Sequence, residues 1–227
     1  MFESCGWRTA MVQYSDLTGL LLVVIAITIV PFIAMVVTCY MKIVVVLGLL
    51  RNALGVQQVP PNMVLNGIAI LVSAYVLAPV AIAASRNLPS DPVAGASSSQ
   101  AVMQAFSAAR EPFRKFLEAH AHERERRFFV RSAAMVWPKD VASELKDTDL
   151  FVLAPAFTLT ELTEAFKIGF LLYVAFIVVD LIIANVLLAM GLNQVQPTNV
   201  AIPFKLLLFV VMDGWSTLIH GLVLTYR

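Results

Sequence analysis

Long apolar segments without charged residues alternate with polar segments along this chain. Residues 17–41, 52–85 and 181–204 contain no Asp, Glu, Lys or Arg, and residues 168–179 continue the last run upstream across Asp180. A helix that crosses a bilayer needs roughly 20 apolar residues, so both ends of the chain can supply such helices. The pattern predicts an all-α membrane protein with two hydrophobic helical hairpins, about four kinked helices in all, and a polar helical insert between them.

Helix-breaking residues set the expected boundaries of the first hairpin. Residues 17–41 are expected to form a retained helix rather than a signal peptide, because the run is long and no net positive charge precedes it. Pro31 should bend or break this helix, since proline removes a helical hydrogen bond. A turn at residues 55–62 precedes a second helix, which is expected to end near Pro79.

The polar insert is also expected to be helical. A linker rich in Pro, Ser, Gly and Ala covers residues 87–99 and leads into a first helix, and Pro112 suits the first turn of the next one. On this second helix two pairs of opposite charges have the i,i+4 spacing that lets them meet: Arg114/Glu118 and Glu123/Arg127.

The last third opens with Thr158-Leu-Thr-Glu161, a capping-box pattern that predicts the start of a long helix. Gly191 is expected to end this helix, and a final helix should begin near Pro203. We therefore divide the chain into an N-terminal hydrophobic hairpin (1–85), a polar insert (86–157) and a C-terminal hydrophobic hairpin (158–227).

The two expected hairpin tips are similar in sequence. The ten residues that begin at Gly55 and the ten that begin at Gly191 share five identical positions. Both segments connect apolar helices, which indicates a pair of similar hairpins. A chance likeness between two turns rich in Gly and Pro is the alternative.

The composition supports the membrane assignment. Of the 227 residues 59% are apolar and 14% charged, whereas soluble domains have about 45–50% and about 25%. The net charge of +1 provides no basic excess to neutralise phosphates, so we expect no binding to nucleic acid. Two cysteines, Cys5 and Cys39, cannot build a disulfide framework.

The charges also predict an orientation. Residues 86–167 carry 22 of the 31 charged residues, eleven of each sign. Lys42 and Arg51 flank the first tip, where no acidic residue lies. The positive-inside rule then places both tips in the cytoplasm, and the insert and both termini in the periplasm.

Motifs for catalysis or metal binding are missing from the sequence. His120 and His122 are two residues apart, so on a helix they point in different directions and do not form an i,i+4 metal pair. The segment Asp213-Gly-Trp-Ser216 does not fit a nucleophile elbow, and there is no Walker or dinucleotide motif. We expect neither an enzyme nor a metal or cofactor.

Charged residues that lie within or beside the apolar runs are the stronger clues: Lys42, Arg51, Asp180, Lys205 and Asp213. A charge inside a membrane helix costs about 2.5–3.5 kcal/mol on insertion scales, so such residues pair or face a polar interior. We expect them to pair helices or subunits; an ion or proton relay is the alternative. Gly214 and Gly221 should let another helix approach closely.

Three segments resemble the FliP/SctR family, the inner-membrane core proteins of flagellar and virulence type III secretion export gates. Residues 41–62 read MKIVVVLGLLRNALGVQQVPPN, residues 155–170 read PAFTLTELTEAFKIGF and residues 202–215 read IPFKLLLFVVMDGW. The pair Gln57 and Gln58, together with the lack of a long cleaved leader, resembles the virulence branch. Only the insert between about 86 and 150 has no recognisable motif.

The resemblance implies a ring-like pentamer that conducts unfolded substrates across the bacterial inner membrane. Several copies of a small two-helix partner and one copy of a larger partner would complete the gate. The resemblance also places the pore constriction after Gly191, at Leu192, Asn193, Gln194 and Val195. The family's constriction is rich in methionine, which seals with soft apolar side chains, so here the seal would fall to Leu192 and Val195 with the two amides. The alternatives are a secondary transporter or a non-conducting membrane scaffold.

Overall fold

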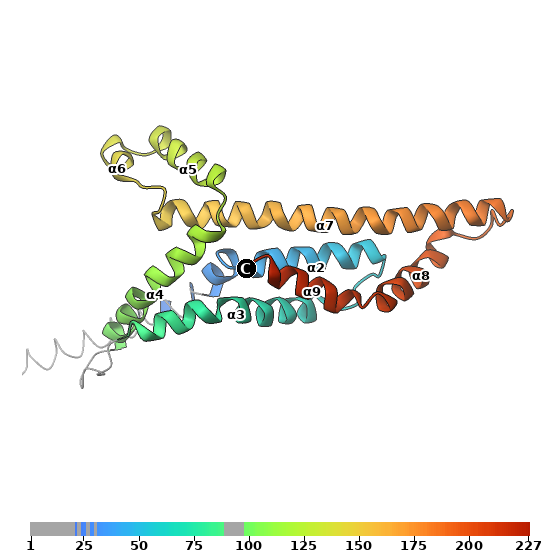
Figure 1. The fold of residues 1–227 in the computed structure, drawn as a ribbon, viewed down its shortest axis with the longest axis horizontal. Coiled ribbons are helices and arrows are strands. Elements are labelled where there is room, and N and C mark those ends of the chain that lie inside the picture. Colours follow the sequence, from blue (N-terminus) through green and yellow to red (C-terminus); the bar gives the residue numbers. More distant parts are fainter. Residues whose placement is uncertain (1–20, 22–23, 26–27, 30, 89–97) are drawn as a thin grey trace, which may run out of the picture.

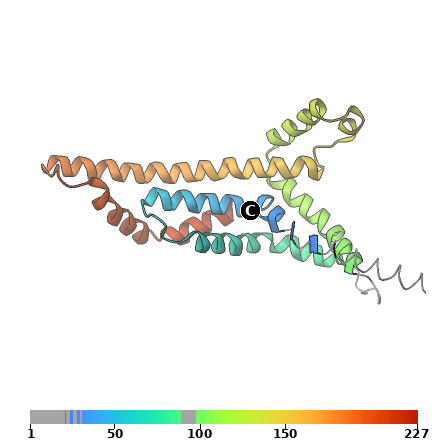
Figure 2. The same cartoon turned by 180° about the vertical axis from the view of Figure 1, so that it is seen from behind.

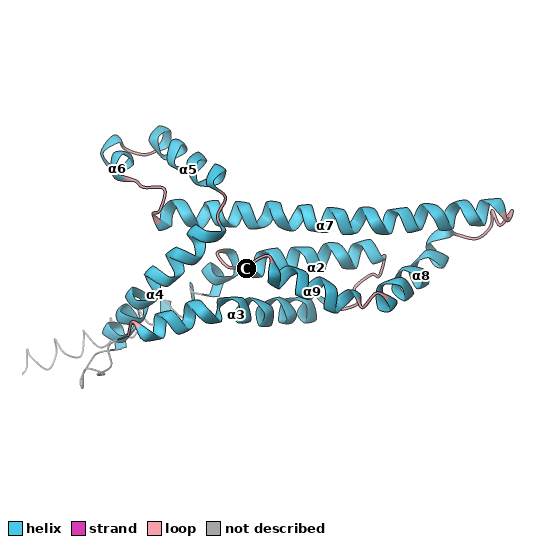
Figure 3. Ribbon diagram, in the orientation of Figure 1, coloured by secondary structure: helices cyan, strands magenta, loops and turns pink. Residues whose placement is uncertain are grey.

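The computed structural model describes residues 21, 24–25, 28–29, 31–88 and 98–227. In this part of the chain the secondary structure is helical and contains no strand (Figure 3). The named helices are α2 (Tyr40–Leu54), α3 (Asn62–Arg86), α4 (Ser98–His120), α5 (Glu123–Val136), α6 (Lys139–Glu144), α7 (Leu150–Ala189), α8 (Pro197–Val211) and α9 (Gly214–Leu224). The predicted all-α class is confirmed.

Helix α7 is the longest helix and runs along most of the described part of the chain (Figure 1). Helices α2, α9 and α3 lie along one side of it, while α5 and α6 project from the other side near its start, as the view from behind also shows (Figure 2). Helix α8 leaves the far end of α7 and returns toward the bundle. The central helix is α2, which packs against both α7 and α3.

Three apolar clusters hold these helices together. The first surrounds α2, where Ile43, Val46 and Leu47 are fully buried against α3, α7 and α9. The second joins the insert to the start of α7 through residues such as Leu117 and Phe157. The third gathers residues of α2, α7 and α8: Leu50, Ala53, Leu54, Phe176 and Phe209. Burying a side chain of this size contributes about 1.5–3 kcal/mol, so the clusters dominate the packing energy.

Much of the apolar surface nevertheless stays uncovered within one chain. Helices α3 and α7 are long and apolar enough to cross a membrane, and α8 with α9 qualifies only as a pair bent by 62°. At 1.5 Å per residue the 40 residues of α7 span about 60 Å, about twice the hydrocarbon thickness of a bilayer. A bilayer can therefore surround only part of α7.

The predicted start of the long helix at Thr158 is wrong. Helix α7 already begins at Leu150, so Glu161 lies in its interior rather than near its N-terminus. The hydroxyls of Thr158 and Thr160 donate to the carbonyls of Ala154 and Ala156, four residues earlier, at 2.9 and 2.8 Å. A Thr-x-x-Glu pattern can satisfy its polar groups inside a helix as well as at its start, which is why the pattern misled.

The prolines end fewer helices than the sequence suggests. Helix α3 continues through Pro79 to Arg86, and α4 continues through Pro112 to His120. The break in the insert falls instead at residues 121–122, where the backbone N–H of His122 donates to the Thr160 hydroxyl at 3.0 Å. A distant side chain thus stabilises a break that the local sequence does not mark.

The final apolar helix is divided in two. Helix α8 begins at Pro197 rather than near Pro203, and the chain bends between α8 and α9 at Asp213, which adopts a left-handed conformation with φ of 50°. The bend brings Trp215 against Phe209, with ring centroids 5.3 Å apart in an edge-on arrangement. This aromatic contact and the burial of Phe209 offset the strained backbone of Asp213.

Nine of the 25 residues of the expected first membrane helix (17–41) lie outside the described residues, as do residues 1–16 and most of the linker. Residues 31–36 are helical, and residues 37–39 form a turn that separates this helical segment from α2. The division into three domains stays a prediction.

Candidate functional site

The predicted constriction loop lies at the far tip of the molecule, where α7 ends (Figure 1). Gly191 ends the helix as predicted, with φ of +73°, and the N–H groups of Gly191 and Leu192 donate to the carbonyls of Leu188 and Leu187. This pair of backbone hydrogen bonds is common at the C-terminal end of a helix. It favours glycine, which has no Cβ to clash at positive φ. Leu192, Asn193, Gln194 and Val195 are all exposed. The loop is therefore open to contacts with other chains.

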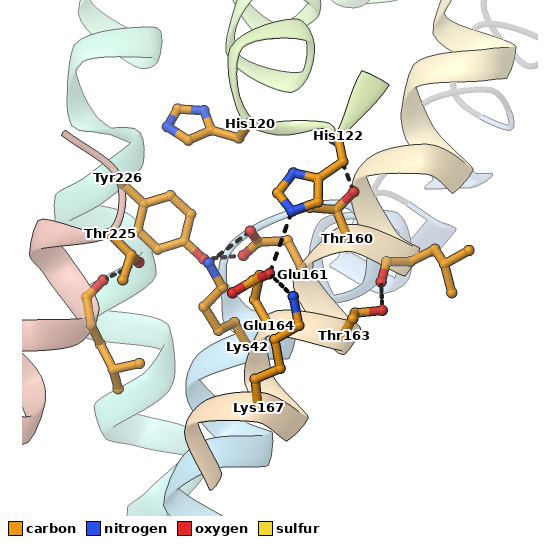
Figure 4. Close-up of polar contacts among 12 residues, drawn as sticks. Lys42, His120, His122, Thr160, Glu161, Thr163, Glu164, Lys167, Thr225 and Tyr226 are labelled. Atoms are coloured by element: carbon orange, nitrogen blue, oxygen red, sulfur yellow. Dashed lines mark hydrogen bonds and ion pairs between the residues drawn. The ribbon is translucent and has the colours of Figure 1, made fainter. Parts of the chain in front are cut away.

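A buried ion pair joins helices α2 and α7. Lys42 Nζ of α2 lies 2.9 Å from Glu161 Oε1 of α7, and the two side chains are only 5% and 2% exposed. The hydroxyl of Tyr226 donates to the other carboxylate oxygen of Glu161 (Figure 4). Lys42 thus does not flank the first tip, where the sequence placed it, but lies in the core, where its ion pair joins α2 to α7.

Tyr226 connects this ion pair to the insert. The Lys42 ammonium lies 4.4 Å from the centre of the Tyr226 ring, a favourable cation–π distance. The ring also contacts Phe116 and His120 of α4, with centroids 6.4 and 5.4 Å away. His120 therefore lies among aromatic rings, and its Nδ1 contacts the Phe116 carbonyl at 2.8 Å.

A second ion pair lies nearer to the tip. Lys205 Nζ of α8 is 2.6 Å from Asp180 Oδ2 of α7 and also donates to the carbonyl of Ala53, in the last turn of α2, at 3.0 Å. The lysine is 6% exposed and the aspartate 42%. Three helices thus meet at a single ammonium group, which we call the Lys205 node (Asp180, Lys205 and Ala53).

The other two embedded charges form no ion pair within the described residues. Arg51 shapes the first tip, where it donates to Asn62 Oδ1 at 2.6 Å and to the Pro60 carbonyl at 3.3 Å. Asp213 is exposed at the bend between α8 and α9. The structure therefore brings Lys205 together with Asp180 and not with Asp213.

The insert carries its own surface ion pairs. The predicted i,i+4 contacts Arg114/Glu118 and Glu123/Arg127 both form. Arg114 also donates two hydrogen bonds to Glu111, which lowers the pKa of the Glu111 carboxyl below its usual value. Water and salt screen such exposed pairs, so they fix the positions of side chains and contribute little to the stability of the fold.

The histidines and acidic residues that the structure describes form no cluster able to hold a metal ion. His122 Nε2 lies 3.4 Å from Glu164, which also pairs with Lys167 at 2.7 Å (Figure 4). His120 and His122 thus point to different surroundings, as their spacing suggested.

Comparison with known proteins identifies the family of this chain. The model of the FliP family matches residues 22–222 of the chain. The chain belongs to the FliP family. It is 66% identical to "Pathogenicity-related ORF2" of Xanthomonas campestris pv. glycines, over 95% of this chain and 100% of that protein. It is 64% identical to "Hypersensitivity response secretion protein HrcR" of Ralstonia nicotianae (95% and 100%) and 48% identical to "Yop proteins translocation protein R" of Yersinia pestis (95% and 99%).

The glycines of this FliP-family chain have different surroundings. A Cβ at Gly214 would lie 2.3 Å from the Phe209 ring, and a Cβ at Gly169 would lie 2.2 Å from the end of Leu49. Gly221 has nothing within 4 Å of a Cβ and lines an apolar cavity of about 480 Å³ between α7, α8 and α9. Gly214 thus serves packing within the chain, whereas the surface at Gly221 is open.

Sequence reasoning missed three residues of this FliP-family core. Glu161 was attributed to a helix start, and Tyr226 and Gly169 were not singled out. A carboxylate, a hydroxyl and a glycine within apolar sequence were the available signals. None of these signals indicates which residues come into contact, because Lys42, Glu161 and Tyr226 lie in three segments far apart in the sequence.

Proposed function

We propose that this chain is a core subunit of a type III secretion export gate in a bacterial inner membrane. The observation that carries the proposal is its similarity, along nearly its whole length, to proteins named for secretion and translocation. The chain would act as a conduit and not as an enzyme. Its substrates would be unfolded secretion proteins.

The gate would be an assembly of several chains. We propose a pentamer of this chain, joined by several copies of a small two-helix partner and one larger partner, as the family resemblance implies. The uncovered apolar surface of α3 and α7 supports assembly in the membrane, because in the most apolar 18 residues of each helix only 11% are buried within one chain.

The proposed orientation has two hairpin tips toward the cytoplasm and the insert and termini toward the periplasm. Of the two basic residues behind this orientation, only Arg51 lies at the first tip, since Lys42 is buried. The tips of α2–α3 and α7–α8 nevertheless point in the same direction (Figure 1), which supports placing them on one side.

The exposed loop at the end of α7 would form the constriction. If five copies surround one axis, Leu192, Asn193, Gln194 and Val195 would form stacked rings that narrow the pore. Irregular backbone at membrane depth is tolerated only where protein or a water-filled cavity surrounds it, and a shared axis provides both.

Replacing Asn193 and Gln194 together with glycine should widen the constriction and raise ion leakage, while the assembled complex persists. Membrane conductance of cells or liposomes that hold the complex measures the leak. Normal membrane resistance despite full assembly would contradict a constriction at this loop.

Cysteine cross-linking tests the same loop without a measurement of ion leakage. In a chain without Cys5 and Cys39, a cysteine at Asn193 should form disulfides between neighbouring subunits and block export. A cysteine at Lys139, exposed on α6, is the control and should not cross-link. Substrate-dependent proton or ion flux through the purified chain alone would favour the transporter alternative instead.

Replacing Gly221 with leucine should reduce the oligomer. The open surface at Gly221 lets another helix approach, and a leucine there would fill it, whereas alanine would leave most of it free. Native mass spectra should show loss of most of the pentamer for Gly221→Leu, with membrane insertion unchanged. An unchanged oligomer would assign the open surface to lipid.

A further inference from the structure

The hairpin formed by the end of α7 and the start of α8, which carries the loop, has few buried contacts with the rest of the chain. Helix α7 continues nine residues past Asp180, to Ala189, and residues 181–204 contain no charge. Leu187 and Ala201 are the only residues of this stretch that are buried. In Figure 1 the hairpin extends beyond the end of α2. Its direction must therefore be set at its base, where α7 and α8 meet α2.

The Lys205 node lies at that base. The ammonium of Lys205 joins α8 to the Asp180 carboxylate of α7 and to the Ala53 carbonyl at the end of α2, at 2.6 and 3.0 Å. The last carbonyls of a helix carry partial negative charge, so the cation has two negative partners. Beside the node, Gly55 packs against Ile202 of α8.

Directional contacts matter in such surroundings. Around the node the third apolar cluster contains Phe176 and Phe209, and the hydrophobic effect that buries such residues has no preferred direction. Charge-assisted hydrogen bonds depend on distance and angle, so they select one arrangement among several of similar apolar contact.

We propose that Lys205 is a positioning residue that fixes the direction of the α7–α8 hairpin relative to α2 and so places the tip loop. The residue does not contact the transported chain; it acts through Asp180 and Ala53. Its role in placing a constriction rests on the proposed function, whereas its role in holding the hairpin does not.

A distance within one chain tests the holding role by itself. Spin labels at Asn52, exposed in the last turn of α2, and at Asn193 in the loop report how the hairpin lies. Labelled chains are diluted into unlabelled ones, so that double electron–electron resonance measures the distance within one chain and not distances between chains. The unmodified node should give one narrow distance distribution.

Lys205→Met keeps the apolar stem and removes the charge, and the single narrow distance should be lost. Asp180→Asn, a milder change at a half-exposed residue, should broaden the distribution less, and Lys205→Arg should restore it in part. Lys42→Met is the control, because Lys42 is as buried as Lys205 (5% against 6% exposed) but its ion pair lies far from the hairpin: the change should lower the yield but leave the distance narrow.

A narrow, unshifted distance in both Lys205→Met and Asp180→Asn would overturn the proposal. Should Lys205→Met not accumulate, Asp180→Asn and Lys205→Arg still decide the matter. Ion leakage of the assembled complexes tests the link to the constriction separately: a lost narrow distance without leakage would retain the positioning role and contradict a seal at the tip.

Discussion

Replacing Glu161 with alanine is expected to lower the free energy of unfolding by about 3–5 kcal/mol, because Lys42 would remain as a buried, unpaired charge. Lys42 and Glu161 are only 5% and 2% exposed, and Tyr226 would lose its carboxylate acceptor as well. Since the stability of a whole domain is about 5–15 kcal/mol, such a loss should strongly reduce the folded fraction of the chain. Thermal unfolding in detergent and the yield of membrane-inserted protein measure the effect.

Two further variants separate burial from charge. Glu164→Ala removes a carboxylate one turn further along α7 that pairs with the exposed Lys167, and it should cost about 0–1 kcal/mol. The double variant Lys42→Met/Glu161→Met removes both charges and should be more stable than either single variant. Equal losses in Glu161→Ala and Glu164→Ala would show that the core ion pair has no special weight.

Replacing Gly169 with leucine should destabilise the contact between α2 and α7 by about 1–3 kcal/mol or more. A Cβ at this position would lie 2.2 Å from Leu49 Cδ1 and 3.0 Å from Leu49 Cβ. The end of Leu49 can turn away, but its Cβ is fixed to α2, so the two helices must separate. A lower unfolding temperature and a less compact complex in gel filtration are the expected results.

Gly48 supplies the matched control, because it is the neighbour of Leu49 and has nothing within 4 Å of a Cβ. Gly48→Ala should stabilise α2 by up to about 1 kcal/mol through helix propensity. If Gly169→Leu proved as stable as Gly48→Ala, the close packing of α2 on α7 would be refuted.

Local pattern was sufficient where the physics is local. The apolar runs predicted helices, Gly191 predicted the end of α7, and the i,i+4 spacing predicted the ion pairs of the insert. Each of these depends on side chains within one or two turns of each other. The three motifs in chain order likewise sufficed to indicate the FliP family, which the family match confirms.

The wrong predictions concern ion pairs and helix ends that depend on residues far away in the sequence. The sequence placed Lys42 beside the first tip and Glu161 at a helix start, but the structure pairs the two residues in the core. Pro79 did not end its helix and Pro112 did not begin a new one. The helical segment ends instead before His122, whose backbone N–H donates to the Thr160 hydroxyl.

The sequence by itself determined a helical membrane protein, its family and the segments that carry its charges, because composition and periodicity depend on neighbours along the chain. Only the tertiary structure decided which charges meet: Lys42 with Glu161 and Tyr226, and Lys205 with Asp180 and the end of α2. Partner choice among buried charges depends on which helices pack together. That packing is set by apolar contacts between residues far apart in sequence, and no local pattern records it.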